Sequence, residues 1–248
     1  MNQLISTFLQ QKNLSKNSQL AYQYDLQQFW EVCEGQFSAG KLEIYLASLQ
    51  QLKATAQQRK LSAVNQFLYF LYEEGQLDRF VKLKIKQATM KQTNQALKVE
   101  DLSDLWLESD LKEGQLIALL IAVVGLTPAE IAGIRSEDLV LDFSVLTVER
   151  DQVRRVVSLT KEIIPYLEHQ TGALFLFDKK GHTYSRQWFF NRLSQYVASL
   201  GQPTWTAQKL REQYILHALE QGKSLEELVK ELGLKSMTSL EKFRKNGY

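Results

Sequence analysis

The chain has 248 residues, 44% of them hydrophobic and 23% charged, with only 3 Pro and 12 Gly. This balance excludes collagen-like, low-complexity and disordered chains and favours long helices. The longest apolar run, Leu116 to Leu126, is shorter than the ~20 residues that span a bilayer, and no signal peptide is visible. One cysteine, Cys33, and three scattered histidines predict neither a disulfide nor a metal site. We expect a cytoplasmic protein with no cofactor, no metal, no membrane partner and no small-molecule substrate.

The net charge of +2 is distributed unevenly along the chain. Residues 1–84 carry a net +2, residues 85–98 a net +3, residues 99–142 a net −8 and residues 143–248 a net +5. The basic regions can form a phosphate-binding face, and the alternative is an ordinary solvated surface.

Three segments of the N-terminal third have the apolar spacing of helices: 15–34, 41–52 and 55–74. Gly75 ends the last of them. These segments predict a compact, all-helical domain over residues 1–84.

A polar, weakly patterned linker is predicted over residues 85–98, followed by a second domain over residues 99–248. Helical spacing recurs in this domain over 100–108, 115–124, 160–168, 185–200, 206–221 and 238–244. Residues 145–148 and 155–159 are rich in β-branched side chains and predict a hairpin with a basic turn over 149–154; a short strand is expected over 174–177.

Two capping signals place helix starts in the second domain. In Thr127-Pro128-Ala129-Glu130, Thr127 is the expected N-cap, Pro128 the first helical residue and Glu130 the reciprocal cap. Ser224 to Glu227 repeats the pattern before another helix.

Several short groups of residues occur along nearly the whole chain in a fixed order and spacing. They are Phe8-Leu9, Leu14 to Ser18, Asp25-Leu26, Arg59 to Ala63, Gly125-Leu126, Glu130-Ile131, Asp138-Leu139, Leu210-Arg211, Leu219 to Gly222 and Leu232-Gly233. In this order the chain resembles the Xer-type tyrosine recombinases of the phage integrase family, and within it a XerD-like subgroup. The resemblance implies a mainly α fold: an N-terminal four-helix, SAM-like core-binding domain and a C-terminal α+β catalytic-type domain with a small β-hairpin or sheet.

That family cuts and rejoins duplex DNA by attack of a tyrosine hydroxyl on a phosphodiester. The chemistry uses two arginines that bind phosphate oxygens, a hairpin lysine that protonates the leaving oxygen, two histidines and the nucleophile. Matched residue by residue, only the second arginine, Arg211, is retained. The other positions hold Thr127 for the first arginine, Arg150 for the lysine, Gln208 and Leu234 for the histidines, and Phe243 for the tyrosine.

These replacements remove the reactive groups. Phe243 has no hydroxyl, and Arg150 stays charged at working pH and is a poor proton donor. Removing one oxyanion donor costs ~10²–10³ in rate, and removing a nucleophile ~10⁶. The sequence therefore predicts a protein that keeps the fold of a site-specific recombinase and has lost DNA cutting and rejoining.

We expect duplex DNA to remain a partner. Besides Arg150 and Arg211, the candidate DNA-binding residues are Arg59, Lys60, Arg154, Arg155, Arg186 and Lys209. Phosphate contacts would make the affinity strongly dependent on salt.

Two alternatives stay open at this point. The protein is an active recombinase if Tyr248 replaces the missing nucleophile, and a protein-interaction module without DNA if the acidic stretch 99–142 lies on the binding face. The family closes its oligomers with a C-terminal exchange helix, which the few residues after Phe243 do not provide, so the oligomeric state is left undecided.

Overall fold

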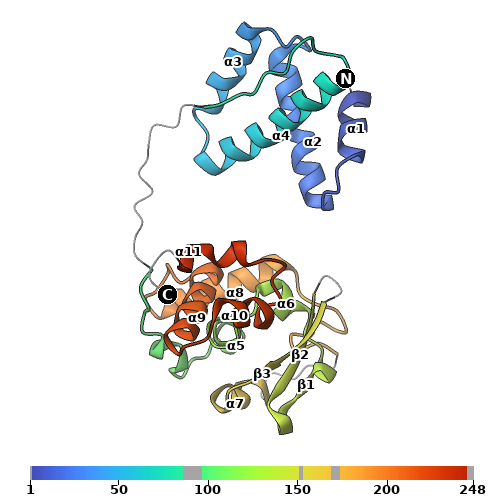
Figure 1. The fold of residues 1–248 in the computed structure, drawn as a ribbon. Helices are drawn as coiled ribbons and strands as arrows, with labels where there is room; N and C mark the ends of the chain where they lie inside the picture. The colour runs from blue at the N-terminus through green and yellow to red at the C-terminus, as the bar shows by residue number, and fades with distance from the viewer. Residues whose placement is uncertain (1, 86–96, 151–152, 169–173, 245–248) are drawn as a thin grey trace. The chain divides into compact units, whose positions relative to one another are not determined.

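The computed structural model of the chain forms two compact units, residues 1–93 and 94–248, whose division falls inside the predicted linker (Figure 1). It describes residues 2–85, 97–150, 153–168 and 174–244. Each unit is described by itself below.

The first unit consists of four helices: α1 (Asn2–Gln10), α2 (Lys16–Cys33), α3 (Ala39–Leu49) and α4 (Ala54–Glu73). The expected four-helix domain is thereby confirmed. Its centre is aromatic, with Phe8 and Phe67 in edge-to-face contact at 5.5 Å between ring centroids and both essentially buried. Such pairs add packing energy to the burial of apolar area.

Residues at or just outside both ends of the predicted linker, 85–98, pack against a unit. Leu83 is buried in the first core, and its backbone N–H and C=O both bond to the amide side chain of Asn65, at 2.7 and 2.9 Å. Leu97 and Val99 pack against an apolar cluster of the second unit.

The second unit is mainly helical, with one small sheet. Its α-helices are α5 (Lys112–Ala122), α6 (Pro128–Gly133), α7 (Ile164–Glu168), α8 (Arg186–Ser199), α9 (Ala207–Glu220), α10 (Leu225–Glu231) and α11 (Glu241–Arg244). Short 3₁₀ turns are η1 (Ser103–Trp106), η2 (Ser136–Asp138), η3 (Leu141–Phe143), η4 (Lys161–Ile163) and η5 (Met237–Leu240). The helix expected over 100–108 is wrong, since that segment forms only η1.

The sheet has the order β1-β2-β3, all antiparallel, from β1 (Leu139–Val140), β2 (Val145–Arg150) and β3 (Val153–Ser158). The hairpin is longer than predicted: Arg150 pairs with Val153, so basic residues expected in the turn lie on the strands. The strand expected over 174–177 is reduced to an isolated bridge between Phe175 and Arg135.

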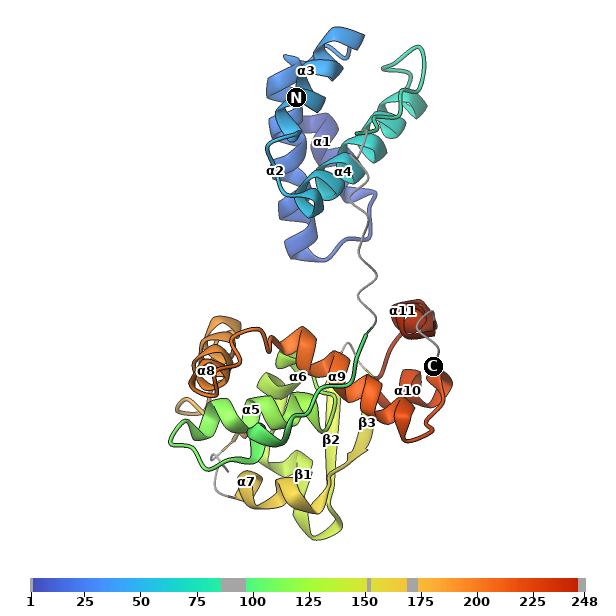
Figure 2. The ribbon, with the colours of Figure 1, turned by 90° about the vertical axis from the view of Figure 1, so that its left-hand side faces the viewer.

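Helix α5 is the centre of the second unit, as the apolar run predicts. Every residue from Leu116 to Ala122 is buried, and α5 packs closely on α8. A Cβ on Gly114 would lie 2.5 Å from the carbonyl oxygen of Arg192, so only glycine permits this approach. Figure 2 shows the sheet below α9 and α11, with α5 to its left. None of the helices in the described ranges combines the length and apolar character that a membrane crossing requires.

Candidate functional site

Helix α9 carries the two residues aligned with the family's His-x-x-Arg motif. Thr206 caps the helix by accepting from the backbone N–H of Lys209 at 3.2 Å. Gln208 is exposed and bonds to Glu212 one turn on, at 3.2 Å. Arg211 is half-buried and makes no hydrogen bond or ion pair within the part of the chain that the structure describes.

The start of α6 is built around the predicted capping box, which is confirmed. The hydroxyl of Thr127 accepts from the backbone N–H of Glu130, while the carboxylate of Glu130 accepts from the backbone N–H and the hydroxyl of Thr127, both at 2.7 Å. Arg150 reaches this point from β2, with its Nη1 3.4 Å from the Thr127 hydroxyl. A guanidinium from the hairpin therefore lies beside the residue that stands in place of the family's first arginine.

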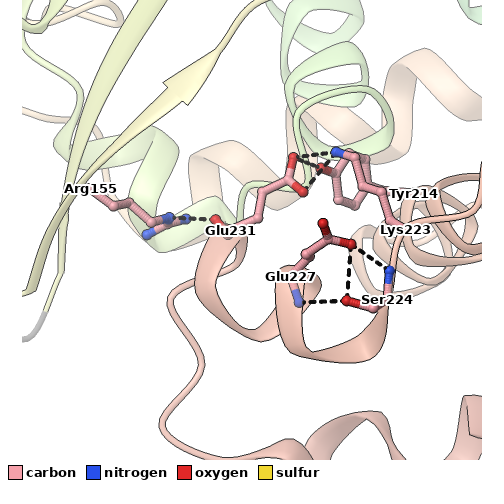
Figure 3. A network of polar contacts seen from close by, with 6 residues as sticks. All are labelled: Arg155, Tyr214, Lys223, Ser224, Glu227 and Glu231. Atoms are coloured by element: carbon pink, nitrogen blue, oxygen red, sulfur yellow. Dashed lines mark hydrogen bonds and ion pairs between the residues drawn. The ribbon is translucent and has the colours of Figure 1, made fainter.

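The same carboxylate holds a second arginine. Nη1 of Arg155, on β3, lies 2.8 Å from Oε1 of Glu130, and its Nε donates to the backbone carbonyl of Glu231 at 2.9 Å. The Arg155 side chain is 11% exposed and that of Glu130 1%. Figure 3 shows Arg155 directed at the last turn of α10. This arginine is largely buried and bonded within the protein, and its predicted contact with DNA stays a prediction.

Three arginines thus surround one carboxylate. Burial lowers the pKa of Arg211, as do the charges of Arg155 and Arg150, and Glu130 partly offsets them. Burial raises the pKa of Glu130. Hydrogen bonds from Thr127 and the charge of Arg155 lower this pKa by more than burial raises it, so it lies below its usual value. Arg211, which has no partner in the described ranges, adds a positive charge beside the Glu130–Arg155 pair, and this charge suits an anion.

Three of the replaced family positions, Gln208, Leu234 and Phe243, meet at one cavity of about 200 Å³. It is lined by Gln208, Arg211, Glu212, Ile215, Leu232, Leu234, Ser239, Leu240, Lys242 and Phe243. Phe243 is 1% exposed and belongs to an apolar cluster with Leu240 and Ile215. Lys242 lies over its ring and pairs with Glu212. The residue aligned with the nucleophile is therefore a core side chain, next to the retained arginine.

Sequence reasoning missed the polar network behind this cavity. Tyr214 donates to the carboxylate of Glu231 at 2.5 Å, and Lys223 pairs with the same carboxylate at 2.8 Å (Figure 3). Burial and the neighbouring Glu231 raise the pKa of Tyr214 well above its usual value. Tyr214 is thus a neutral structural tyrosine. Its place one turn after Arg211 on α9 is the only sequence signal that points to it.

The first unit holds two more of the predicted DNA-binding residues. Lys60 is buried, with its Nζ 2.8 Å from Oδ1 of Asp25 and 2.5 Å from Oε1 of Gln28. Arg59 is 43% exposed and lies 2.7 Å from the other oxygen of Asp25. Lys60 is therefore an internal ion-pair partner, and its predicted contact with DNA stays a prediction.

The remaining predicted residues lie at the surface of the second unit. Arg154 is exposed on β3 opposite Glu149, and exposed Arg186 stacks over Phe190 with 5.3 Å to the ring centroid. Lys209 pairs with Glu100 at 2.6 Å, so its charge is compensated. Tyr248, the alternative nucleophile, lies outside the described residues.

The comparisons with known proteins agree with this architecture. Residues 1–75 match the family model described as phage integrase, N-terminal SAM-like domain. Two solved structures share the fold over most of the chain. The Tn1549 transposon integrase in complex with circular intermediate DNA has a TM-score of 0.70 at 13% identity, covering 96% of this chain and 92% of that one. The XerH site-specific recombinase bound to difH has 0.66 at 12%, covering 97% and 92%. The fold is that of the phage integrase class.

Proteins that are similar in sequence over nearly the whole chain define the family more narrowly. A protein of Streptococcus suis (strain 05ZYH33) named tyrosine recombinase XerD-like is 56% identical over 98% of this chain and 100% of its own length. Its namesake in Streptococcus gordonii (strain Challis) is 46% identical over 98% and 100%. The chain belongs to the family of XerD-like tyrosine recombinases.

Proposed function

We propose that this protein binds duplex DNA through its recombinase fold and does not cut it. The observation that carries the proposal is the buried ring of Phe243, which lies beside Arg211 where the resemblance implies a hydroxyl. A phenylalanine cannot form a phosphate ester. Leu234 and Gln208 line the same cavity and supply no imidazole.

DNA binding is supported by four arginines of the second unit. Arg211 has no partner in the described ranges, Arg154 and Arg186 are exposed, and Arg150 reaches the start of α6. Guanidinium groups bind phosphate oxygens with paired N–H donors. We infer that Arg150 and Arg211 contact one phosphate group of an intact strand.

Three acidic residues of the stretch 99–142 have cationic partners. Glu130 is neutralised by Arg155, Glu100 pairs with Lys209, and Glu137 pairs with Arg135 at 3.1 Å. Acidic residues that already have cationic partners oppose a phosphate less than free ones. The net charge of a sequence segment therefore overstates its repulsion of DNA.

A mobility-shift titration of a labelled duplex at 50 and 200 mM salt tests binding, and a nicked suicide duplex on a denaturing gel tests cleavage. We expect a retarded complex that weakens steeply with salt, because released counterions set the slope, and no covalent adduct. We expect the Arg211→Met variant, tested beside the unaltered protein, to bind the duplex less tightly.

Three results would contradict the proposal. An adduct mapped to Tyr248 would establish an active recombinase with a displaced nucleophile. Lack of retention at 50 mM salt would favour a protein-interaction module. Equal affinity of the Arg211→Met variant would remove the proposed phosphate contact.

A further inference from the structure

We propose that Gln213 is a positioning residue: it fastens residues 97–101, here called the strap, along α9 and thereby fixes the helix that presents Arg211 to a phosphate. The inference rests on the proposed DNA binding and names a buried residue that acts on Arg211 without contacting DNA. The contacts of the strap, the apolar cluster beside it and the geometry of α9 support the inference.

The side-chain amide of Gln213 bonds to the strap on both sides of Val99. Its Oε1 accepts from the backbone N–H of Glu100 at 2.8 Å, and its Nε2 donates to the backbone carbonyl of Lys98 at 3.0 Å. Gln213 itself is 1% exposed. Backbone groups withdrawn from water need hydrogen-bond partners, and one buried side chain supplies two of them here. The strap is therefore tied to α9 by a side chain of that helix.

Glu100 of the strap makes further contacts along α9. Its carboxylate accepts from Nε1 of Trp205 at 3.1 Å and pairs with Lys209 at 2.6 Å. Its backbone oxygen lies 3.3 Å from Nε2 of His217. These partners extend from the residue before the N-cap of α9 to the last turn of the helix, so the strap is held along much of its length.

The strap also packs on the apolar cluster that contains Phe243. Leu97 and Val99 lie against this cluster, whose members on α9 include Tyr214 and Ile215. The cluster is distinct from the core around α5. The seating of α9 on this side therefore depends on the strap as well as on α10 and α11.

Arg211 lies on the other side of α9 from the strap. With about 3.6 residues per turn, positions 209, 213 and 217 share one face of the helix, and Arg211, two residues from both 209 and 213, lies on the nearly opposite face. Arg211 lines its cavity together with Gln208 and Ile215, which are three residues before it and four after it. The strap thus supports α9 from behind the side chain that is proposed to contact phosphate.

A double-variant cycle on DNA affinity separates positioning from a general loss of stability. Gln213→Met keeps the length of the side chain and removes both hydrogen bonds to the strap. We expect it to weaken duplex binding about fivefold in the mobility-shift titration at low salt, the equivalent of one neutral hydrogen bond. In an Arg211→Met background the same change should weaken binding by less than about twofold, because a residue that acts through Arg211 has no effect once Arg211 is gone.

Gln115 offers a matched control within the same unit. Its amide is also buried, and its Nε2 donates to the backbone carbonyls of Leu105 and Leu107 at 3.1 and 2.7 Å, but it lies on α5. Gln115→Met removes hydrogen bonds of the same kind without touching the strap. We expect it to change DNA affinity by the same factor with and without Arg211.

Hydrogen exchange of backbone amides reports on the strap directly. The amide of Glu100 is bonded to Gln213, so it should exchange faster in Gln213→Met, while protection in α5 stays unchanged. If Gln213→Met does not fold, Val99→Ala removes an apolar contact from the strap itself. Val99→Ala should weaken DNA binding when Arg211 is present and not when it is replaced.

Failure of this inference is distinguishable from failure of the proposed function. If the unaltered protein does not retain the duplex, or if Arg211→Met binds as tightly as the unaltered protein, the proposed function fails and this inference with it. If both of those tests succeed and Gln213→Met weakens binding by the same factor in both backgrounds, only this inference is overturned. Unchanged affinity of a folded Gln213→Met, or unchanged exchange at Glu100, would overturn it as well.

Discussion

Two clusters of cations, one in each unit, differ in how their charge is used. In the first unit, Arg59 and Lys60 share the carboxylate of Asp25. In the second, the partner of Glu130 is Arg155, and the nearby Arg211 has no partner in the described ranges. Whether a basic residue is available to a ligand thus depends on the buried carboxylate beside it.

The two carboxylates also differ in what they stabilise. Asp25 is fully buried and joins α2 to α4 through Lys60, so its cluster belongs to the core of its domain. Glu130 caps α6 and joins this helix to β3 of the sheet through Arg155. The first cluster is primarily structural, and the second places charge at a surface.

The largest effect should come from Asp25→Asn. This change leaves Lys60 buried at 7% exposure without its counter-charge, and breaking a buried pair costs about 3–5 kcal/mol. Native-state hydrogen exchange of peptides from α2 and α4 measures the loss in the first unit. Protection in α5 should be unchanged, and a loss below about 1 kcal/mol would show that this pair is solvated.

A glycine behind the second cluster should give the next largest effect. Gly125 has φ +75, and a Cβ there would lie 2.6 Å from the ring of Tyr214. We expect Gly125→Ala to cost about 1–2 kcal/mol for the left-handed backbone and about 1–3 more for overpacking. Gly201→Ala, at φ +73 with no atom within 4 Å, is the matched control. Equal losses in urea unfolding would show that packing around Tyr214 adds nothing.

The Glu130 cluster should depend on pH in a defined direction. Because the pKa of Glu130 is lowered in the folded protein, its contribution to stability is present above the unfolded value of ~4.3 and is lost as the pH falls through the folded pKa. The gap in unfolding free energy between the unaltered protein and Glu130→Gln should therefore shrink below about pH 4. A gap that stays constant from pH 7 to pH 3 would contradict this assignment.

The smallest effect should come from Arg59→Met. Arg59 is 43% exposed, and Oδ2 of Asp25 lies near it without forming an aligned hydrogen bond. Exposed pairs contribute about 0–1 kcal/mol, so the unfolding free energy of the first unit should change by no more than that. A larger loss, equal to that of Lys60→Met, would make the two cations equivalent partners of Asp25.

Most of the fold was predictable because its signals are local. Capping boxes at Thr127 and Ser224, the apolar spacing of α2 and α4, and the buried run of α5 each depend on neighbours along the chain. The errors fall where long-range contacts decide the structure. The segment 100–108 has helical spacing, yet Leu105 and Trp106 form a 3₁₀ turn that packs on the second core.

The sequence predicted which residues form the candidate site, but not which residues they pair with. Alignment with the family identified Gln208, Leu234 and Phe243, and the structure places all three at one cavity. No sequence pattern indicated that Arg155 binds Glu130, 25 residues away, or that Lys60 binds Asp25 across two helices. Ion pairs between distant segments follow from the tertiary fold, and the local sequence does not encode them.

The proposed loss of strand cleavage is tested most directly by restoring the hydroxyl. Phe243→Tyr is incubated with a nicked suicide duplex, and covalent products are sought on a denaturing gel. We predict none, because Thr127, Gln208 and Leu234 still occupy positions of reactive groups and the ring at 243 is 1% exposed. A phosphotyrosyl adduct at residue 243 would contradict the account.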